Sequence, residues 1–171
     1  MKKYELLVDD TITFFGVQLF RIKALISFSG IEKGEVGGYI ASEKNLSQSG
    51  NAWVYGNAWV YGNAKVYGDA EVSGNAKVSG NAKVSGDAWV YGNAKVSGDA
   101  DYIVFKNTWS SGRYFTYTKS NRKWRVGCFY GSGAELVEKA YKDSKKSGDF
   151  YKAYVDFVEK LEAIEDIHKE Q

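Results

Sequence analysis

The chain lacks most of the residues from which catalytic and metal sites are usually built. Its 171 residues include one cysteine, Cys128, and one histidine, His168. A single cysteine excludes an internal disulfide, which is typical of proteins from a reducing compartment. One cysteine and one histidine also form no ligand spacing, so we expect no metal and no cofactor.

Long hydrophobic runs are missing too. No apolar stretch reaches the roughly 20 residues that a membrane-spanning helix requires. Glu5, Asp9 and Asp10 interrupt the N-terminal segment, so a signal peptide is not expected. These features predict a cytoplasmic protein that makes no contact with a membrane.

An excess of charge is absent from the chain as a whole but present in one segment. The net charge is +2, whereas residues 104–131 carry six basic side chains and no acidic one. Six charges over this length are few for a nucleic-acid-binding surface, so nucleic acid is disfavoured as a partner.

What the chain does contain is a strict six-residue repeat. Between Gly50 and Ile103, nine consecutive units read Gly-[Asn/Asp]-Ala-x-Val-[Tyr/Ser], except that the ninth ends in Tyr102-Ile103. A fixed short period indicates one structural unit stacked on itself. Within each unit Ala-x-Val is a short strand, so alanine and valine face inward and x faces outward. Glycine with Asn or Asp forms the corner.

Three such units can close a triangle, and in this the repeat resembles the hexapeptide-repeat family. The resemblance implies a mainly β fold, a left-handed parallel β-helix, and nine units correspond to about three coils. We expect Ile40 and Leu46 to share the phase of Ala52, so that the first coil begins before the clean repeat. The open ends of a β-helix expose unpaired backbone and require caps.

Four segments follow from this assignment: an N-terminal β cap (1–37), the β-helix (38–103), a basic aromatic β-hairpin (104–131) and a C-terminal helical cap (132–171). Strands are predicted at 3–8, 12–15, 18–28, 102–106, 114–119 and 122–130. A two-residue turn is expected at Ser120-Asn121, with asparagine at positive φ. Helices are predicted at about 133–145, capped by Ser132 with Glu135, and about 150–168, capped by Asp149. Cys128 should be a small core residue within a strand. The second helix carries one apolar stripe, made of Phe150, Tyr154, Phe157, Val158, Leu161 and Ile164. We expect this stripe to pack on the end of the β-helix or on the hairpin, with a partner helix as the alternative.

Outward positions of an 18-residue coil stack in columns, and one side of the column is rich in rings. We call the following residues the aromatic surface: Trp53, Tyr55, Trp59, Tyr61, Trp89 and Tyr91. Exposed indoles usually mark an interface, so these residues are candidates for an oligomer contact, with a trimer favoured. Cover by the chain's own termini and a stacking platform for a ligand are the alternatives.

The segment 104–131 is the second candidate site, because cations interleaved with rings are what a phosphate-bearing base requires. The candidate ligand-binding residues are Arg113, Tyr117, Lys119, Arg122, Lys123, Trp124 and Arg125. The alternative is an amphipathic cap in which Trp124 points inward and the charges are solvated.

Hexapeptide-repeat proteins are best known as trimeric acyltransferases that use a histidine on a coil or its loop as the base. A hydroxyl or amine acceptor needs such a base, and this chain has none in its repeat. A repeat carboxylate such as Glu71 or Asp101 is the only substitute. We therefore expect no enzymatic activity.

Three segments carry a closer resemblance: LFRIKALISF, GEVGGYIASEKNLSQSGNAWVYGNA and GDADYIVF…RVGCFYGSGAELVEKA. They are similar to hexapeptide-repeat, acyltransferase-like or polymer-forming proteins of bacteriophage and bacterial genomes. This resemblance implies a phage origin and carries no catalytic residues.

The function predicted from these features is a non-enzymatic, self-associating binding protein with an anti-defence role in the host cytoplasm. Its partner would be a host defence protein or a nucleotide-like anionic ligand. The alternatives are a degenerate acyltransferase that retains CoA binding and a structural, polymer-forming element.

Overall fold

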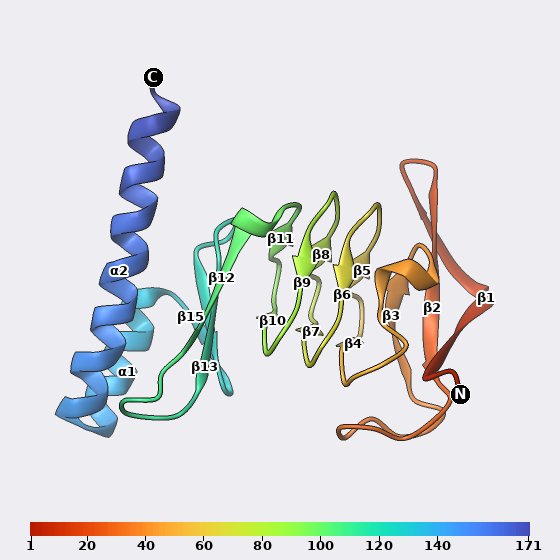
Figure 1. Cartoon of the computed structure of the whole chain (residues 1–171), viewed down its shortest axis with the longest axis horizontal. Coiled ribbons are helices and arrows are strands. Elements are labelled where there is room, and N and C mark those ends of the chain that lie inside the picture. The colour runs from red at the N-terminus through yellow and green to blue at the C-terminus, as the bar shows by residue number, and fades with distance from the viewer. The chain divides into compact units, whose positions relative to one another are not determined.

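The computed structural model describes all 171 residues, and its strands are followed by two helices (Figure 1). The chain divides into two compact units: Met1–Val104 with Thr116–Asn121, and Phe105–Phe115 with Arg122–Gln171. The predicted segment 104–131 therefore contributes to both units. No helix is long and apolar enough to cross a lipid bilayer.

The elements of the first unit are β1 (Tyr4–Phe14), β2 (Val17–Ala24), β3 (Val36–Ile40), η1 (Glu43–Asn45), β4 (Trp53–Val54), β5 (Trp59–Val60), β6 (Lys65–Val66), β7 (Glu71–Val72), β8 (Lys77–Val78), β9 (Lys83–Val84), β10 (Trp89–Val90), β11 (Lys95–Val96) and η2 (Asp99–Asp101). The remaining elements are β12 (Tyr102–Lys106), β13 (Tyr114–Thr118), β14 (Lys123–Val126), β15 (Phe129–Gly131), α1 (Gly133–Asp143) and α2 (Lys145–Lys169).

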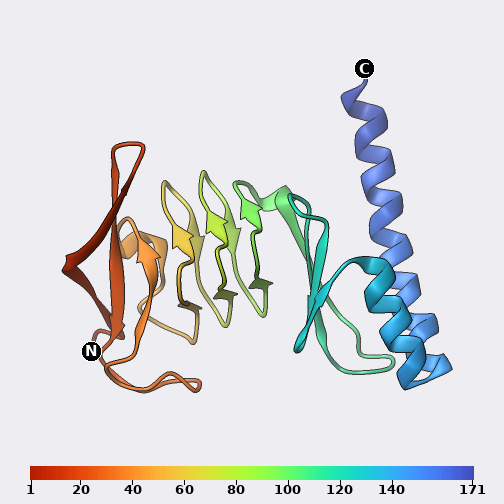
Figure 2. The same cartoon turned by 180° about the vertical axis from the view of Figure 1, so that it is seen from behind.

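The middle of the first unit is a parallel β-solenoid of about three turns, which confirms the predicted fold class. Trp53 on β4 pairs with Glu71 on β7, which is 71 − 53 = 18 residues later. The same step joins β5 to β8 and β6 to β9. Three six-residue units therefore make one turn, and the strands form three walls, β4-β7-β10, β5-β8-β11 and β6-β9. Figures 1 and 2 show these strands as successive loops of the column.

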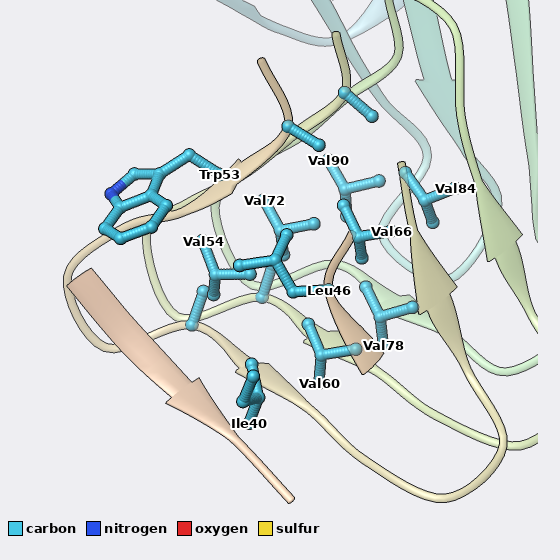
Figure 3. Close-up of a cluster of buried hydrophobic side chains, with 14 of the residues drawn as sticks. Ile40, Leu46, Trp53, Val54, Val60, Val66, Val72, Val78, Val84 and Val90 are labelled. Carbon is cyan, nitrogen blue, oxygen red and sulfur yellow. The ribbon is translucent and has the colours of Figure 1, made fainter. Parts of the chain in front are cut away.

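The alanine and valine of each unit fill the interior, as the alternation of side chains along a strand predicts. Both residues are buried in each of the first eight units, Ala58 and Val60 for example, whereas Ala100 of the ninth unit is exposed. Figure 3 shows the valines of successive turns gathered in the middle of the column. The outward lysines Lys65 and Lys83 are exposed, so the assignment of the two faces is confirmed.

Glycine at the corners serves two purposes. The φ angles of Gly74 and Gly80 are 70° and 59°, in the left-handed region that destabilises other residues by about 1–2 kcal/mol. A Cβ on Gly74 would also lie 2.9 Å from the backbone nitrogen of Gly92 in the next turn. The corners therefore need glycine for the bend and for the close stacking of turns.

Backbone hydrogen bonds join each turn to the next, as when the Trp59 N–H donates to the Ala76 carbonyl at 2.9 Å. The strands of the first and last turns lack a neighbouring turn on one side, so some of their carbonyl and N–H groups have no partner in the repeat. Because buried backbone groups require partners, both edges need caps.

Side-chain donors cover carbonyls at the first edge. The ammonium of Lys3 donates to the carbonyl of Ala52 at 2.8 Å, and the Asn45 amide donates to the carbonyl of Ala64 at 2.8 Å. The remaining wall is continued by β3, which pairs in parallel with β5. Lys3 and Asn45 are polar side chains that are almost completely buried, and this role explains why.

At the last edge, one side-chain oxygen for each wall accepts from a backbone N–H, and the Tyr102 hydroxyl donates to the carbonyl of Lys83. The donor–acceptor pairs are Lys83 N to Asp99 Oδ1 at 2.7 Å, Trp89 N to Thr116 Oγ1 at 2.9 Å and Lys95 N to Ser120 Oγ at 2.7 Å. Side chains from the end of the repeat and from the segment around β13 thus complete the column.

Two details of the predicted coil are wrong. The ninth unit does not form a strand, because Asp99–Asp101 turn into η2. The start of the first coil is also offset, since Ile40 pairs with Val60, which is 60 − 40 = 20 residues later. Ile40 and Leu46 therefore occupy valine positions and not the phase of Ala52, and two additional residues lie in the corner that follows Leu46.

The N-terminal cap is one long antiparallel hairpin. The predicted strands 3–8 and 12–15 are a single strand, β1, whose pairing with β2 is irregular between Leu7 and Thr11. Phe15 and Gly16 turn the chain with positive φ angles of 45° and 79°. β2 ends at Ala24, four residues before the predicted boundary, and β3 joins the hairpin to the solenoid.

The strands β12 to β15 follow one another in a four-stranded sheet. The predicted strand 122–130 is in fact two strands, and exposed Cys128 lies in the turn between them and not in a core. The turn before β14 spans four residues, and Arg122, not Asn121, has positive φ (52°).

Both predicted helices are present. The capping box of α1 is confirmed, because Ser132 Oγ accepts from the Glu135 backbone at 3.2 Å and Glu135 Oε2 accepts from the Ser132 backbone at 2.7 Å. The predicted cap of α2 is wrong: Ser144 is the cap, and its hydroxyl accepts from the Ser147 backbone at 3.0 Å. Asp149 lies inside the helix, paired with Lys145 at 2.6 Å.

Candidate interaction surfaces

The aromatic surface is divided by the N-terminal cap. Trp53 points away from the valine interior, as predicted (Figure 3), yet its exposed fraction is 0%. The rings of Tyr4 and Phe28 meet it edge-on, with centroids 6.1 and 5.5 Å away. The expectation that Trp53 contacts another subunit is therefore wrong, because the chain's own terminus covers it.

Trp59 is covered in part by the tip of the same hairpin. The ring of Phe14 packs edge-on against Trp59 at 5.1 Å and also lies 5.8 Å from Tyr61. The ammonium of Lys77, in the next turn of the column, lies 4.1 Å from the Trp59 ring and 4.8 Å from Phe14. A cation between two rings is a favourable arrangement, so this group stabilises the cap against the solenoid.

The remaining rings of the aromatic surface are half-buried and engaged with their neighbours. The indole N–H of Trp89 donates to Ser73 Oγ at 2.8 Å, and the Tyr91 ring lies edge-on at 6.2 Å. Burial, followed by the charges of Glu71 and Glu35, raises the pKa of Tyr55 to about 12. Five of the six rings, all except Trp53, retain partial exposure, and this reduced set remains available for a contact.

The seven predicted ligand-binding residues are divided between the two units, and two of them are buried. Tyr117 and Trp124 are 3% and 2% exposed, so neither ring can stack on a ligand in this structure. Along β14, Lys123 and Arg125 face the side opposite Trp124, as the alternation predicts. This arrangement is that of an amphipathic cap with solvated charges.

The cations of this segment also have local partners. The main-chain carbonyl of Cys128 accepts from Arg125 at 3.3 Å. Hydrogen bonds from Ser132 are the main cause of the lowered pKa of the Glu135 carboxyl. The nearby charge of Lys123 lowers this pKa further. Lys119 lies in the first unit, where its charge acts on Asp101. The other two cations, Arg113 and Arg122, are exposed, and Arg122 lies in the turn before β14.

The candidate bases do not form a catalytic constellation. His168 lies exposed near the end of α2, far along the chain from the repeat. Burial alone would raise the pKa of Asp101, but hydrogen bonds from Ser97 and Gly98 lower it overall, which makes this carboxylate a weaker base. Its oxygen Oδ2 accepts three bonds that close a corner of the column, two from Ser97 and one from Gly98. No cluster of three or more His, Cys, Asp or Glu residues is arranged to hold a metal ion.

The structure reveals an apolar surface that lies at the stripe predicted for α2 but faces outward. Four side chains on the C-terminal half of the helix are between 40 and 59% exposed: Phe157, Leu161, Ile164 and Ile167. The buried residues of the helix lie on a different side and nearer its start, Tyr151, Val155 and Val158 among them. We call the four exposed residues the α2 stripe. The sequence indicated the helical spacing of the apolar residues but not that they are exposed.

The comparisons with known proteins add no name to these surfaces. No model of a known protein family matches the chain, and no curated protein matches its sequence.

Proposed function

We propose that this protein acts by binding and not by catalysis, as a self-associating module built on a capped β-solenoid. The observation that carries the proposal is the α2 stripe. Four large apolar side chains are about half exposed on one helix, which is unfavourable in water unless another surface covers them. The half-buried rings Trp89 and Tyr91 provide a second, smaller contact area on the solenoid.

The 18-residue turn with glycine corners supports assignment to the hexapeptide-repeat class, in which coils are left-handed and trimers are common. The partner that we propose beyond self-association is a host defence protein, in line with the phage origin implied by the resemblance. The burial of Tyr117 and Trp124 disfavours the alternative of a nucleotide-like ligand on the basic hairpin.

A degenerate acyltransferase is the second candidate, because the solenoid itself is of the type that those enzymes use. It requires a base beside the acyl acceptor, and Asp101 is engaged in three hydrogen bonds that hold its pKa low. A filament formed by end-to-end stacking is the third candidate. Stacking would have to displace Lys3 and Asn45 at one edge and Asp99, Thr116 and Ser120 at the other.

Sedimentation velocity over a concentration series tests the proposal. We expect a discrete oligomer to form within the micromolar range, with no material growing to filament size. A protein that remains a monomer at about 100 µM would contradict self-association.

Calorimetry with acetyl-CoA then separates the first two candidates. No heat of binding is expected, whereas saturable binding would favour the acyltransferase. Affinity capture from host lysate, compared with a variant that carries a charge in the α2 stripe, would test for the host protein.

A further inference from the structure

The exposed side of α2 follows the spacing of a coiled coil. Tyr154, Phe157, Leu161, Ile164 and His168 are separated by three, four, three and four residues. This is the alternation of the a and d positions of a heptad, with Tyr154, Leu161 and His168 at a. Such a seam is a helix surface shaped to receive another helix, since each side chain inserts between four residues of its partner.

The unit that contains α2 covers only the start of this seam. Tyr154 lies against the rings of Phe105 and Phe115, with centroids 5.4 and 5.1 Å away, and the Phe157 ring lies 5.9 Å from Phe105. Within the unit, helix α1 lies beside the first half of α2 and does not reach the second half (Figures 1 and 2). The side chains that α2 buries, Tyr151, Val155 and Val158, lie on the flank of the seam.

Charges beside the seam select both the partner and its direction. Lys160 occupies position g and Glu165 position e of the following heptad, and both lie on the surface of the helix. In a parallel assembly of identical helices, g of one copy meets the next e of its neighbour, so Lys160 would meet Glu165. In an antiparallel pair g meets g and e meets e, which would bring like charges together. The complementary occupant is therefore the same helix in the same direction.

The apolar residues indicate more than two helices. Leucine at a with isoleucine at d, here Leu161 and Ile164, shifts coiled coils from dimers to trimers and tetramers. Ile167, at position g, is 59% exposed and widens the apolar band beyond the two seam positions. A wider band suits a bundle in which each helix contacts two neighbours.

We propose that the segment from Phe157 to His168 forms a parallel three-helix coiled coil with the same segment of two other copies. The inference rests on the proposed self-association and specifies the surface that produces it. The seam is short, about 18 Å along the helix axis. A peptide of this length would be marginal as a helix, but α2 enters the seam from turns already packed against α1.

The first experiment compares two charged substitutions one residue apart. Ile164→Asp places a carboxylate in the seam, whereas Ala163→Asp places one on the exposed side of the helix next to it. Light scattering after size exclusion should give three times the monomer mass for the parent chain and for Ala163→Asp, and the monomer mass for Ile164→Asp. Circular dichroism should show the same helix content in both variants.

The second experiment tests direction, in a Cys128→Ser background that leaves no other thiol. His168→Cys places thiols at one level of a parallel seam, but about 20 Å apart in an antiparallel pair centred on Leu161. Mild oxidation should link His168→Cys chains and leave Glu159→Cys chains, whose thiols point outward, unlinked. Lys160→Glu should weaken assembly about tenfold, and combining it with Glu165→Lys should restore it.

The outcomes separate the two proposals. An oligomer that survives Ile164→Asp, a dimer or tetramer mass, or no link through His168→Cys would overturn the coiled coil while self-association stands. A parent chain that is monomeric at about 100 µM would overturn both.

Discussion

The cap at the first edge of the solenoid can be tested by changing a single group of atoms. Asn45 is 1% exposed, and its amide nitrogen donates to the carbonyls of Gly62 at 3.1 Å and Ala64 at 2.8 Å. Its amide oxygen accepts from the backbone of Ser42 at 2.9 Å. Asn45→Asp keeps the shape and that acceptor, but it replaces the only donor with an oxygen.

The magnitude follows from the groups left without partners. Two backbone carbonyls lose their donor, at about 1–3 kcal/mol each when buried, and a carboxylate then faces them in place of an N–H group. We expect the free energy of unfolding to fall by about 3–5 kcal/mol near neutral pH. Burial and the carbonyl dipoles raise the pKa of the introduced carboxyl group, so the loss is present above that pKa. It should shrink as the pH falls through the pKa, because a protonated carboxyl can donate one bond.

Urea unfolding followed by tryptophan fluorescence measures this loss. The chain supplies a matched control in Asn57→Asp, because Asn57 lies exposed at a corner where other units already carry aspartate, as at Asp69. The control should change stability by less than about 0.5 kcal/mol. Equal stability of the two variants would refute the argument that a buried donor is needed at this edge.

Three further predictions concern the other edge, the buried lysine and the corners. Thr116→Val removes the acceptor of the Trp89 N–H at nearly constant volume and should lower the free energy of unfolding by about 1–2 kcal/mol in the same urea assay. Burial lowers the pKa of Lys3 to about 8, below its value in the unfolded chain. The unfolded state therefore binds more protons above that pH, and stability should rise by about 2 kcal/mol from about pH 8 to about pH 9.5. Lys3→Met should abolish this rise in pH-dependent denaturation, and a rise that persists in the variant would assign it to another group. Gly74→Ala should lower the melting temperature more than Gly56→Ala does. Both glycines have positive φ, but only Gly74 lies against the backbone of the next turn. Equal decreases in melting temperature would mean that the positive φ alone, and not the close stacking of turns, requires glycine.

Residues outside the regular units close the two edges of the solenoid. Lys3 and Asn45, which precede the repeat, donate to carbonyls at the first edge. Asp99, at the end of the repeat, and Thr116, after it, accept from N–H groups at the last edge.

Local pattern predicted the regular parts of the fold. A six-residue period, glycine at each corner and alternation within each strand determine 18 residues per turn and an Ala/Val interior, because each depends only on neighbours along the chain. The helices were also recognised, since Ser132 and Glu135 satisfy the first turn of α1 locally. The cap of α2 was misplaced at Asp149, because Ser144 serves as the last cap of one helix and the first of the next.

The candidate contact surfaces depended on distant residues and were less predictable. Trp53 faces outward as its position in the unit requires, but Tyr4 and Phe28 come from segments 49 and 25 residues earlier (53 − 4 and 53 − 28) and bury it. No local signal in the repeat distinguishes Trp53 from Trp89, although only the first is fully covered.

The amino-acid sequence by itself thus determined the column: its period, its filling and the direction in which each residue of a unit points, since these follow from backbone geometry over six residues. Only the tertiary structure decided which outward residues meet solvent. Trp53 is buried because segments distant in the sequence pack against it, and the α2 stripe is exposed because none covers it. Such packing depends on how much surface two elements bury together, and the order of residues within a single element does not determine it.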